Sequence, residues 1–365
     1  MNKIENIAKE FCQGYNLKKI QSFGSGNIND TYKVDLDNES RDSYILQRIN
    51  KNVFKKPELI IENMKTIINH IQNETYQNPQ KHNGWQIPSI LKTSEQNDYF
   101  IHEDGSFWRA ITYIKNSKTY ESLSKKNHAS QIGYVLGKFH ALISTIDNQS
   151  LHDTLPGYHV VPGYYQAYLE SKKATSRDLN DDLLQYCMRI IENRSNCVSV
   201  LENARIKKIL VERPVHGDPK ISNILFDQDS ELAIGIIDLD TVKPGLVHYD
   251  IGDCLRSSCN ILGEDAEDFE AIHFDTAVCE DILKSYLDQT RSFLTISDYD
   301  YLYECIHLIT FEMGIRFFGD YLAGDRYYKV AHEKHNLYRG LVQLKLLESI
   351  EQQEKRIRKI IAKYT

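Results

Sequence analysis

The sequence predicts an α+β protein with a small antiparallel-sheet lobe followed by a larger, mainly helical lobe. Two observations support this prediction. In the first third of the chain apolar and polar residues alternate in short runs, and after it apolar residues recur at spacings of three and four. We therefore expect a first lobe at residues 1–114, a hinge at 115–119 and a helical lobe at 120–365.

The first lobe reads as strands with one helix between them. The helix begins at Pro57, a residue type favoured in the first turn, and its apolar positions continue to Ile71. Polar turns separate the runs that we expect to be strands. These runs are residues 31–36, 43–49, 89–93, 98–102 and 107–114.

The second lobe has the longer periodic segments. We expect helices at residues 131–146, 164–172, 181–191, 299–321 and 336–364. Three short apolar runs interrupt them and are expected to form strands that end in polar loops. These runs are residues 211–215, 224–226 and 232–237.

Composition excludes several classes of protein. The 51 acidic and 44 basic residues give a net charge of −7, whereas a nucleic-acid-binding protein more often has a basic surplus. The seven cysteines include no C-x-x-C pair, which indicates free thiols in a reducing compartment. No apolar stretch approaches the ~20 residues of a membrane span, and the N-terminus lacks a signal-peptide pattern. We expect a cytoplasmic protein that binds neither nucleic acid nor membrane.

The residues most suited to chemistry lie between positions 216 and 240. Asp218 begins a loop, Asn223 follows five residues later, and Asp238 ends a later apolar run. Together they would supply oxygen ligands for Mg²⁺ and a carboxylate that accepts a hydroxyl proton. Phosphoryl transfer requires these groups, because the protein mainly positions the reactants and neutralises charge. The alternative is that each residue only caps a turn.

This pattern, H-G-D-x-x-x-x-N followed by I-D-x-D, resembles the aminoglycoside phosphotransferase/choline kinase superfamily. The resemblance implies a two-lobed protein-kinase-like fold that uses ATP and Mg²⁺. A closer resemblance, to the N-acetylhexosamine 1-kinase family, extends over nearly the whole chain. It implies that the acceptor is the anomeric hydroxyl of N-acetylglucosamine or N-acetylgalactosamine. The segments that carry it are residues 26–32, 44–50, 237–245, 250–253, 313–325 and 335–337.

The resemblance implies roles for individual residues. Asp218 matches the catalytic base and contacts the acceptor, Asn223 and Asp238 match the metal ligands, and Arg316 matches a sugar contact. Spacing alone offers another interpretation of Arg316, a surface ladder of charges with residues 312 and 320 on one helix. Asp240 either lies in the outer layer of the metal site, behind the ligands themselves, or caps the turn that follows it.

The nucleotide is expected to bind in the first lobe. Backbone N–H groups of Gly24, Ser25 and Gly26 would cover the phosphates, although an ordinary hairpin turn would look the same. Asn27 stands where the related family tends to have a histidine that contacts sugar. Gln47 occupies the strand position where kinase-like folds usually have a phosphate-binding lysine, so the usual Lys–Glu ion pair cannot form there.

The adenine is expected to meet the backbone of Tyr113 and Ile114, just before the hinge. Two alternatives to the sugar kinase stay open. One is a kinase of another small hydroxyl compound, such as an aminoglycoside, choline or homoserine. The other is a pseudokinase that binds nucleotide or sugar without turnover.

Overall fold

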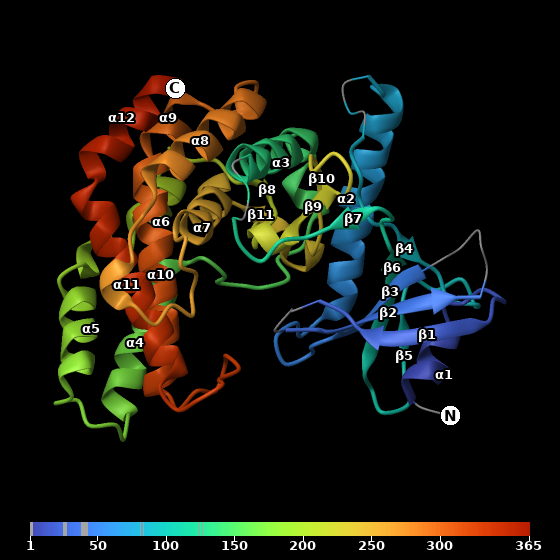
Figure 1. Cartoon of the computed structure of the whole chain (residues 1–365), viewed down its shortest axis with the longest axis horizontal. Coiled ribbons are helices and arrows are strands. Elements are labelled where there is room, and N and C mark those ends of the chain that lie inside the picture. Colours follow the sequence, from blue (N-terminus) through green and yellow to red (C-terminus); the bar gives the residue numbers. More distant parts are fainter. Residues whose placement is uncertain are drawn as a thin grey trace.

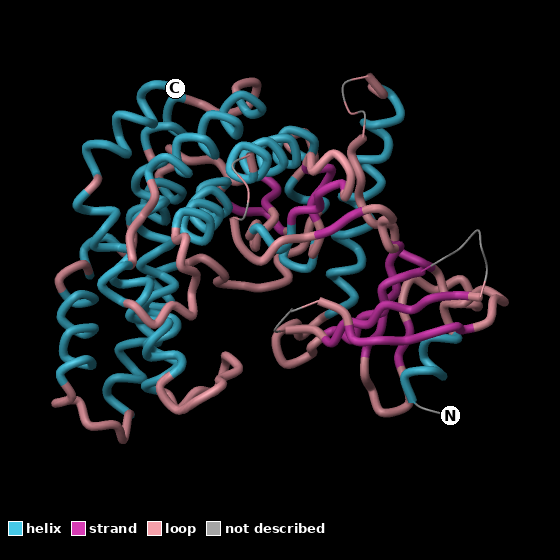
Figure 2. The backbone as a smooth tube through the Cα atoms, in the orientation of Figure 1, coloured by secondary structure: helices cyan, strands magenta, loops and turns pink. Residues whose placement is uncertain are grey.

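The first part of the chain is built on an antiparallel sheet (Figures 1 and 2). The structure is a computed structural model that describes residues 3–24, 28–37, 43–80, 82, 84–123, 125 and 127–365. The sheet has the order β1-β2-β3-β6-β4, and β5 also pairs with β6. Its strands are β1 (Leu17–Ser22), β2 (Asp30–Leu36), β3 (Ser43–Ile49), β4 (Ile90–Leu91), β5 (Phe100–Ile101) and β6 (Phe107–Thr112).

The pairing register brings two polar side chains together inside this sheet. Gln47 of β3 lies opposite Arg109 of β6. The predicted strands are confirmed, although β4 and β5 are only two residues long. Strand β1 and the short helix α1 (Lys3–Lys9) were not predicted. In β1, L-K-K-I-Q-S, the apolar residues do not alternate with polar ones, so the strand gives no period-two signal.

Helix α2 (Pro57–Gln77) connects the sheet with the rest of the molecule. Its buried residues recur at helical spacing along one side and include Ile60, Met64 and Ile67. The helix contacts α3 (His128–Ile143) and the short turn Leu239–Thr241 of the helical lobe. In Figure 1 it lies between the sheet and the helices, beside the polar loops described below.

The second part of the chain is mainly helical, which confirms the predicted fold class. Helix α3 packs along α8, and α10 packs against α4, α7 and α11. A Cβ atom at Gly133 would lie 2.2 Å from the carbonyl oxygen of Ile282, so the close approach of α3 to α8 requires glycine there. The other helices are α4 (Val161–Ala174), α5 (Asp182–Glu192), α6 (Val200–Ile206), α7 (Val247–Cys259), α8 (Thr276–Thr290), α9 (Ile296–Asp300), α10 (Leu302–Leu322), α11 (His335–Gln352) and α12 (Glu354–Tyr364).

Several features of the helical lobe differ from the prediction, and helices α6 and α8 were not predicted. The single helix expected at 336–364 is divided into α11 and α12 at Gln353. Helix α7 was not predicted as a helix, because its buried residues include charged ones such as Asp250, Asp253 and Arg256. A helix that is buried on all sides and carries polar groups inside shows no amphipathic stripe.

Short strands frame two polar loops in the helical lobe. Strand β9 (Ile224–Asp227) pairs with β10 (Ala233–Ile236) and with β7 (Ser117–Lys118), and β8 (Arg213–Val215) pairs with β11 (Lys243–Gly245). These strands hold the loop at 216–223 and the loop at 237–242 side by side.

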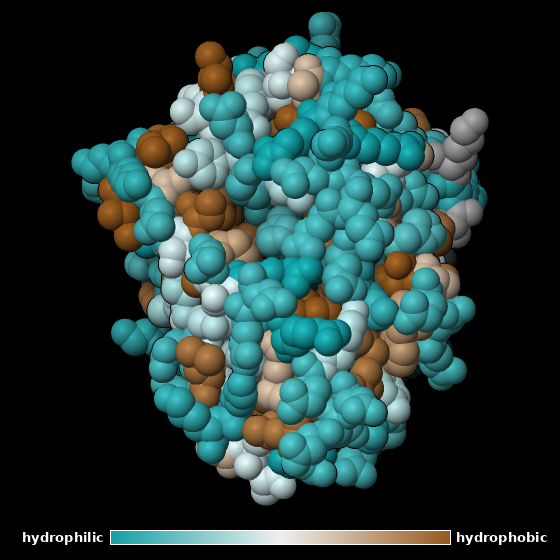
Figure 3. All heavy atoms as spheres, turned by 90° about the vertical axis from the view of Figure 1, so that its left-hand side faces the viewer, coloured by the Kyte–Doolittle hydropathy of each residue, from teal (hydrophilic) through white to brown (hydrophobic). Residues whose placement is uncertain are grey.

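The surface agrees with the composition. Figure 3 shows hydrophilic side chains over most of the helical face, with apolar ones scattered among them. Among the described residues, no helix is both long and apolar enough to cross a membrane. All seven cysteines are free, as predicted.

Candidate active site

The loop that carries Asp218 is fixed by buried groups beneath it. The carboxylate of Asp250, on α7, accepts hydrogen bonds from the backbone N–H of His216 at 2.6 Å and of Gly217 at 2.8 Å. The imidazole of His140 lies 2.8 Å from the same carboxylate. Gly217 has a φ of 87°, and a Cβ atom there would lie 2.8 Å from Thr241. The loop therefore requires glycine at position 217. Its hydrogen bonds to Asp250 fix the position of the next residue, Asp218.

Asp218 lies among groups that keep it ionised. Its carboxylate lies 2.8 Å from the ammonium group of Lys220 and accepts a hydrogen bond from the Asn223 amide at 3.2 Å. Burial alone would raise the pKa of Asp218, but Lys220, His216 and Arg256 lower it below its usual value. Asp218 is therefore a carboxylate at neutral pH and can accept a proton or a hydrogen bond from a hydroxyl group. Lys220, which the sequence analysis missed, follows Asp218 by only two positions.

The second carboxylate, Asp238, is brought to the same place by the β9–β10 hairpin. The backbone N–H of Ile237 donates to the carbonyl oxygen of Asn223 at 2.9 Å, which joins the two loops. Asp238 has a left-handed backbone, with φ 65°. Burial raises the pKa of Asp238 to about 7, and the nearby Asp240 and Asp218 add to the effect. Lys220 and Arg109 lower the pKa of Asp238 but do not outweigh these effects.

These residues fit a divalent cation. The amide nitrogen of Asn223 is occupied by the backbone and carboxylate oxygens of Asp218, so its amide oxygen is left for a ligand. Within the described part of the chain, no hydrogen-bond donor contacts the Asp238 carboxylate, and no group of three or more His, Cys, Asp or Glu side chains is arranged to hold a metal ion. Mg²⁺ commonly takes one or two protein oxygens and completes its shell with phosphate and water. When bound, it would neutralise phosphate charge between Asn223 and Asp238.

We expect Asn223→Ala and Asp238→Ala to raise the Mg²⁺ concentration needed for half-maximal activity. The effect should be larger for Asp238→Ala, because that change removes a negative charge as well as a ligand. Titrations of activity with Mg²⁺ at saturating ATP test this, with Asp288→Ala on the exposed face of α8 as the control. An unchanged titration in both variants would contradict the metal assignment.

Asp240 has a different environment from the one expected of a metal ligand. One carboxylate oxygen forms an ion pair with Arg109, and the other accepts a hydrogen bond from Asn29 at 2.7 Å. Asp240 is 3% exposed and Arg109 is 1% exposed. Both oxygens of Asp240 are thus used, which argues against direct coordination of a metal. The contacts of Asp240 with Arg109 and Asn29 instead join this loop to the sheet lobe, a role that turn capping does not describe.

Arg109 explains how the site accommodates glutamine at position 47. Its guanidinium donates to the Gln47 side-chain oxygen at 3.0 Å and 2.7 Å and also contacts Asp240. The Gln47 amide nitrogen then donates to Thr31 at 3.2 Å. The positive charge that position 47 lacks is therefore present on the neighbouring strand, where Arg109 pairs with Asp240. Sequence analysis missed Arg109, although an arginine inside the apolar run F-W-R-A-I-T was a visible signal.

The nucleotide side of the site is described in part. Gly24 has a φ of 77° and is exposed, whereas Ser25, Gly26 and Asn27 lie outside the described residues. Asn29 donates a hydrogen bond to Asp240 at 2.7 Å and so joins this part of the sheet lobe to the loop after Asp238.

The residues expected to contact adenine, Tyr113 and Ile114, lie near Phe23, which precedes Gly24. The ring of Tyr113 meets Phe23 edge-on, with centroids 6.0 Å apart, and the Lys33 ammonium lies 4.1 Å from the Tyr113 centroid. The carbonyl oxygen of Ile114 accepts a hydrogen bond from Ser117 at 2.6 Å. The chain thus turns just after Ile114, and Tyr113 lies against Phe23. The adenine contacts of both residues stay a prediction.

Arg316 lies in a buried cluster on α10. Its guanidinium donates to Glu312 at 3.1 Å. It also faces three tyrosine rings, with 4.7 Å to the centroid of Tyr164, 5.3 Å to Tyr158 and 5.8 Å to Tyr328. The pKa of Tyr158 is raised first by burial and then by the charge of Asp218, so this tyrosine lies within the field of both Asp218 and Arg316.

The surface-ladder interpretation of Arg316 is wrong. Glu312 is fully buried, and Arg316 is only 9% exposed. Asp320 does not pair with Arg316. Its carboxylate instead accepts hydrogen bonds from the backbone N–H groups of Arg326, Tyr327 and Tyr328, at 2.9–3.0 Å. Asp320 thereby holds the loop that places Tyr328 over Arg316.

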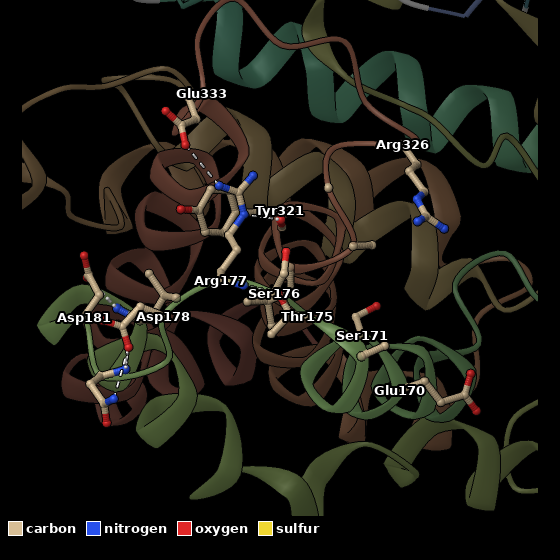
Figure 4. A pocket seen from close by; sticks show the side chains of 16 residues that line it. Glu170, Ser171, Thr175, Ser176, Arg177, Asp178, Asp181, Tyr321, Arg326 and Glu333 are labelled. Atoms are coloured by element: carbon tan, nitrogen blue, oxygen red, sulfur yellow. Dashed lines mark hydrogen bonds and ion pairs between the residues drawn. The ribbon is translucent and has the colours of Figure 1, made fainter.

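The cavity shown in Figure 4 lies away from these groups. It has a volume of about 1000 Å³ at the C-terminal ends of α4 and α10, and none of the predicted site residues lines it. Its central Arg177 stacks on Tyr321 and pairs with Asp325 and Glu333, so its charge is already compensated. We therefore assign the active site from the chemistry of the two loops and not from cavity size.

Known proteins share the family and the fold of this chain. A family model described as "Phosphotransferase enzyme family" matches residues 19–281. Among solved structures, an aminoglycoside phosphotransferase from Alicyclobacillus acidocaldarius is 15% identical, with TM-score 0.62 and coverage of 97% of this chain and 96% of its own. A choline kinase from Cryptosporidium parvum is 12% identical (TM-score 0.59, 98% and 99%). A spectinomycin phosphotransferase solved with ADP and spectinomycin is also 12% identical (TM-score 0.57, 94% and 98%).

Proposed function

The chain belongs to the phosphotransferase enzyme family, and within it we propose a kinase that transfers the γ-phosphoryl group of ATP to the anomeric hydroxyl of an N-acetylhexosamine. The product is the sugar 1-phosphate of N-acetylglucosamine or N-acetylgalactosamine. Asp218 is the proposed base, Asn223 and Asp238 hold Mg²⁺, and Arg316 contacts the sugar.

The observation that carries this proposal is the free edge of the Arg316 guanidinium. One amino group is held by Glu312 and lies near the sulfur of Met313. In the described part of the chain, the other guanidinium nitrogens have no hydrogen-bond acceptor. A fixed planar fork with unused N–H groups is suited to donate two hydrogen bonds to adjacent oxygens of a ligand. A hexosamine offers such oxygens on its ring and its acetamido group.

The charge of the cluster favours a neutral acceptor over a cationic one. Choline and aminoglycosides are cations, and aromatic faces can bind a quaternary ammonium. Here Arg316 already occupies the faces of the tyrosines and would repel a second cation. The hydroxyl of Tyr328 is buried without a partner among the described residues, which is a further polar group for an uncharged, hydroxyl-rich ligand.

The chain's own groups account for the proton in this reaction. The acceptor hydroxyl donates a hydrogen bond to the Asp218 carboxylate, and its proton moves there as the new O–P bond forms. Lys220 balances the negative charge of Asp218 before the transfer. The rigid support from Asp250 keeps the carboxylate in place, so little reorganisation is needed at the moment of reaction.

An ATP-consumption screen tests the proposal. The acceptors are N-acetylglucosamine, N-acetylgalactosamine, glucose, galactose, choline and kanamycin, and products are examined by ³¹P NMR for an anomeric phosphate. We expect turnover with one or both N-acetylhexosamines. Turnover with choline or kanamycin alone would overturn the choice of acceptor, and no turnover with any compound would favour the pseudokinase alternative.

Arg316→Ala is expected to lower kcat/KM for the sugar by roughly 10–150-fold, because it removes charged hydrogen bonds worth about 1.5–3 kcal/mol. The KM for ATP should stay within about twofold. Arg316→Lys should be nearly as damaging, since lysine keeps the charge but lacks the fork. Steady-state kinetics with sugar and ATP varied separately measure both effects. Arg358→Ala, at an exposed position of α12, is the control. Normal sugar kinetics in Arg316→Ala would refute the assignment.

A further inference from the structure

His159 joins the acceptor side of the site to the catalytic loop. It lies just before α4 and is 2% exposed. One ring nitrogen, Nε2, lies 3.1 Å from the carbonyl oxygen of Gly217, and the other, Nδ1, lies 3.2 Å from both carboxylate oxygens of Glu312. Glu312 also accepts the hydrogen bond of Arg316. A single imidazole therefore connects the residue before Asp218 to the residue that holds the proposed sugar contact.

Both neighbours of this ring are hydrogen-bond acceptors. A backbone carbonyl has no proton to donate, and neither has an ionised carboxylate. A neutral imidazole carries only one N–H, so it can satisfy only one of the two. The contacts at Nδ1 and Nε2 therefore require the doubly protonated, positively charged form of His159.

The surrounding charges favour the same state. Burial lowers the pKa of His159, but the carboxylates of Glu312 and Asp253 outweigh this effect and raise it above the usual value, against an opposing effect of Arg316. Burial likewise raises the pKa of Glu312, but His159 and Arg316 lower it, so that the carboxylate stays ionised. The titratable and charged groups that face His159 come from α4, α7, α10 and its own loop: Glu312, Arg316, Asp253, Tyr249, Tyr158 and Tyr164.

The backbone at His159 is also constrained. Its φ is 64°, in the left-handed region that residues with side chains adopt uncommonly. The ring is stacked on Tyr249, with centroids 5.6 Å apart. A strained backbone that holds a buried ring between two acceptors indicates a fixed bridge rather than a mobile side chain.

We propose that His159, as a buried imidazolium, is a positioning residue that fixes the Gly217–Asp218 loop relative to Arg316 and the bound acceptor. The proposal rests on the proposed function, since it places the acceptor at Arg316. Loss of the proton at high pH removes one of the two N–H groups, so either Gly217 or Glu312 loses its donor. The bridge is therefore complete at low pH and is lost as pH rises through the pKa of His159, above its usual value of about 6.5.

The protonation state can be measured without any substrate. Protein carrying ¹⁵N-labelled histidine is examined by NMR over a range of pH, and the signals of His159 are assigned by their absence from His159→Asn. Asparagine tolerates the left-handed backbone but is too short to bridge. We expect both ring nitrogens to be protonated at pH 7, with a titration midpoint above about 6.5. An unprotonated nitrogen at pH 7, or a midpoint below that value, overturns the proposal whatever the acceptor is.

Kinetics then test the positioning role, with N-acetylglucosamine as the acceptor. In His159→Gln the amide can donate to Gly217 but does not titrate. We expect kcat to fall about 10–100-fold at pH 7, as for a displaced catalytic group. The KM for ATP should stay within about twofold, and the loss of kcat that wild type shows at alkaline pH should be absent. The same alkaline loss in wild type and His159→Gln, or no such loss in wild type, overturns the proposal.

Two further variants keep the test independent of folding defects at position 159. Glu312→Gln retains the histidine but removes the charge that holds its proton, so the alkaline loss of kcat should move to lower pH. An unmoved profile counts against the bridge. His248→Gln is the matched control, because His248 is a buried histidine whose one hydrogen bond among the described residues is to the carbonyl oxygen of Asp298. It should keep the wild-type profile. If N-acetylglucosamine is not phosphorylated at all, the proposed acceptor fails, while the NMR result still decides the protonation of His159.

Discussion

Asp218→Asn is expected to lower kcat by about 10²–10⁴-fold while leaving ATP binding intact, since that range is typical of the loss of a general base. Asparagine has nearly the same shape, and its side-chain oxygen can still accept the hydrogen bond from Lys220. What it loses is the ability to take the hydroxyl proton. Because this interaction matters mainly in the transition state, kcat should fall far more than nucleotide affinity.

Three measurements are needed. Steady-state turnover gives the loss, calorimetric titration with ATP and Mg²⁺ gives the affinity, and thermal unfolding shows that the variant is folded. Asp288→Asn on the exposed face of α8 serves as the control for a lost carboxylate. If Asp218→Asn retains more than about a tenth of wild-type turnover, Asp218 is not the base.

The proximity of the candidate catalytic residues could be predicted from the sequence because it is local. Asp218 and Asn223 lie on one short loop, and Asp238 follows through a hairpin whose two apolar runs are visible in the sequence. In the structure the β9–β10 register, with Ile224 opposite Ile236, brings the two loops together. Short loops between strands leave few alternatives for the placement of their polar residues.

The supporting contacts could not be predicted because they join distant segments. Arg109 and Asp240 are 131 positions apart, and His159 and Glu312 are 153 apart. Neither pair has a periodic or local signal, since each depends on how the lobes and helices pack. The burial of Arg316 could not be predicted from the sequence either. Its i, i+4 spacing from Glu312 indicated a surface ladder, and only the burial of that helix face shows an internal ion pair.

Arg109→Met is expected to destabilise the protein by about 3–5 kcal/mol, because it leaves the carboxylate of Asp240 buried without its cation. Arg109 is the connection between β3, β6 and the loop after Asp238, and the pair is almost fully buried. Methionine fills much of the space of the arginine stem, so the loss reports mainly on charge and hydrogen bonding. Denaturant unfolding of wild type and variant measures the difference.

A double variant separates the ion pair from packing. In Arg109→Met with Asp240→Asn the buried charge is gone, and the amide can still accept the hydrogen bond from Asn29. We therefore expect the double variant to be more stable than Arg109→Met alone by at least about 1 kcal/mol. The coupling energy between Arg109 and Asp240 should exceed the coupling energy of a typical exposed ion pair. The exposed pair of Arg358 and Glu354 is the control and should show a coupling of about 1 kcal/mol or less. A loss below about 1 kcal/mol in Arg109→Met would mean that the sheet lobe is held to the catalytic loops by other contacts, and that Arg109 does not replace the charge absent at Gln47.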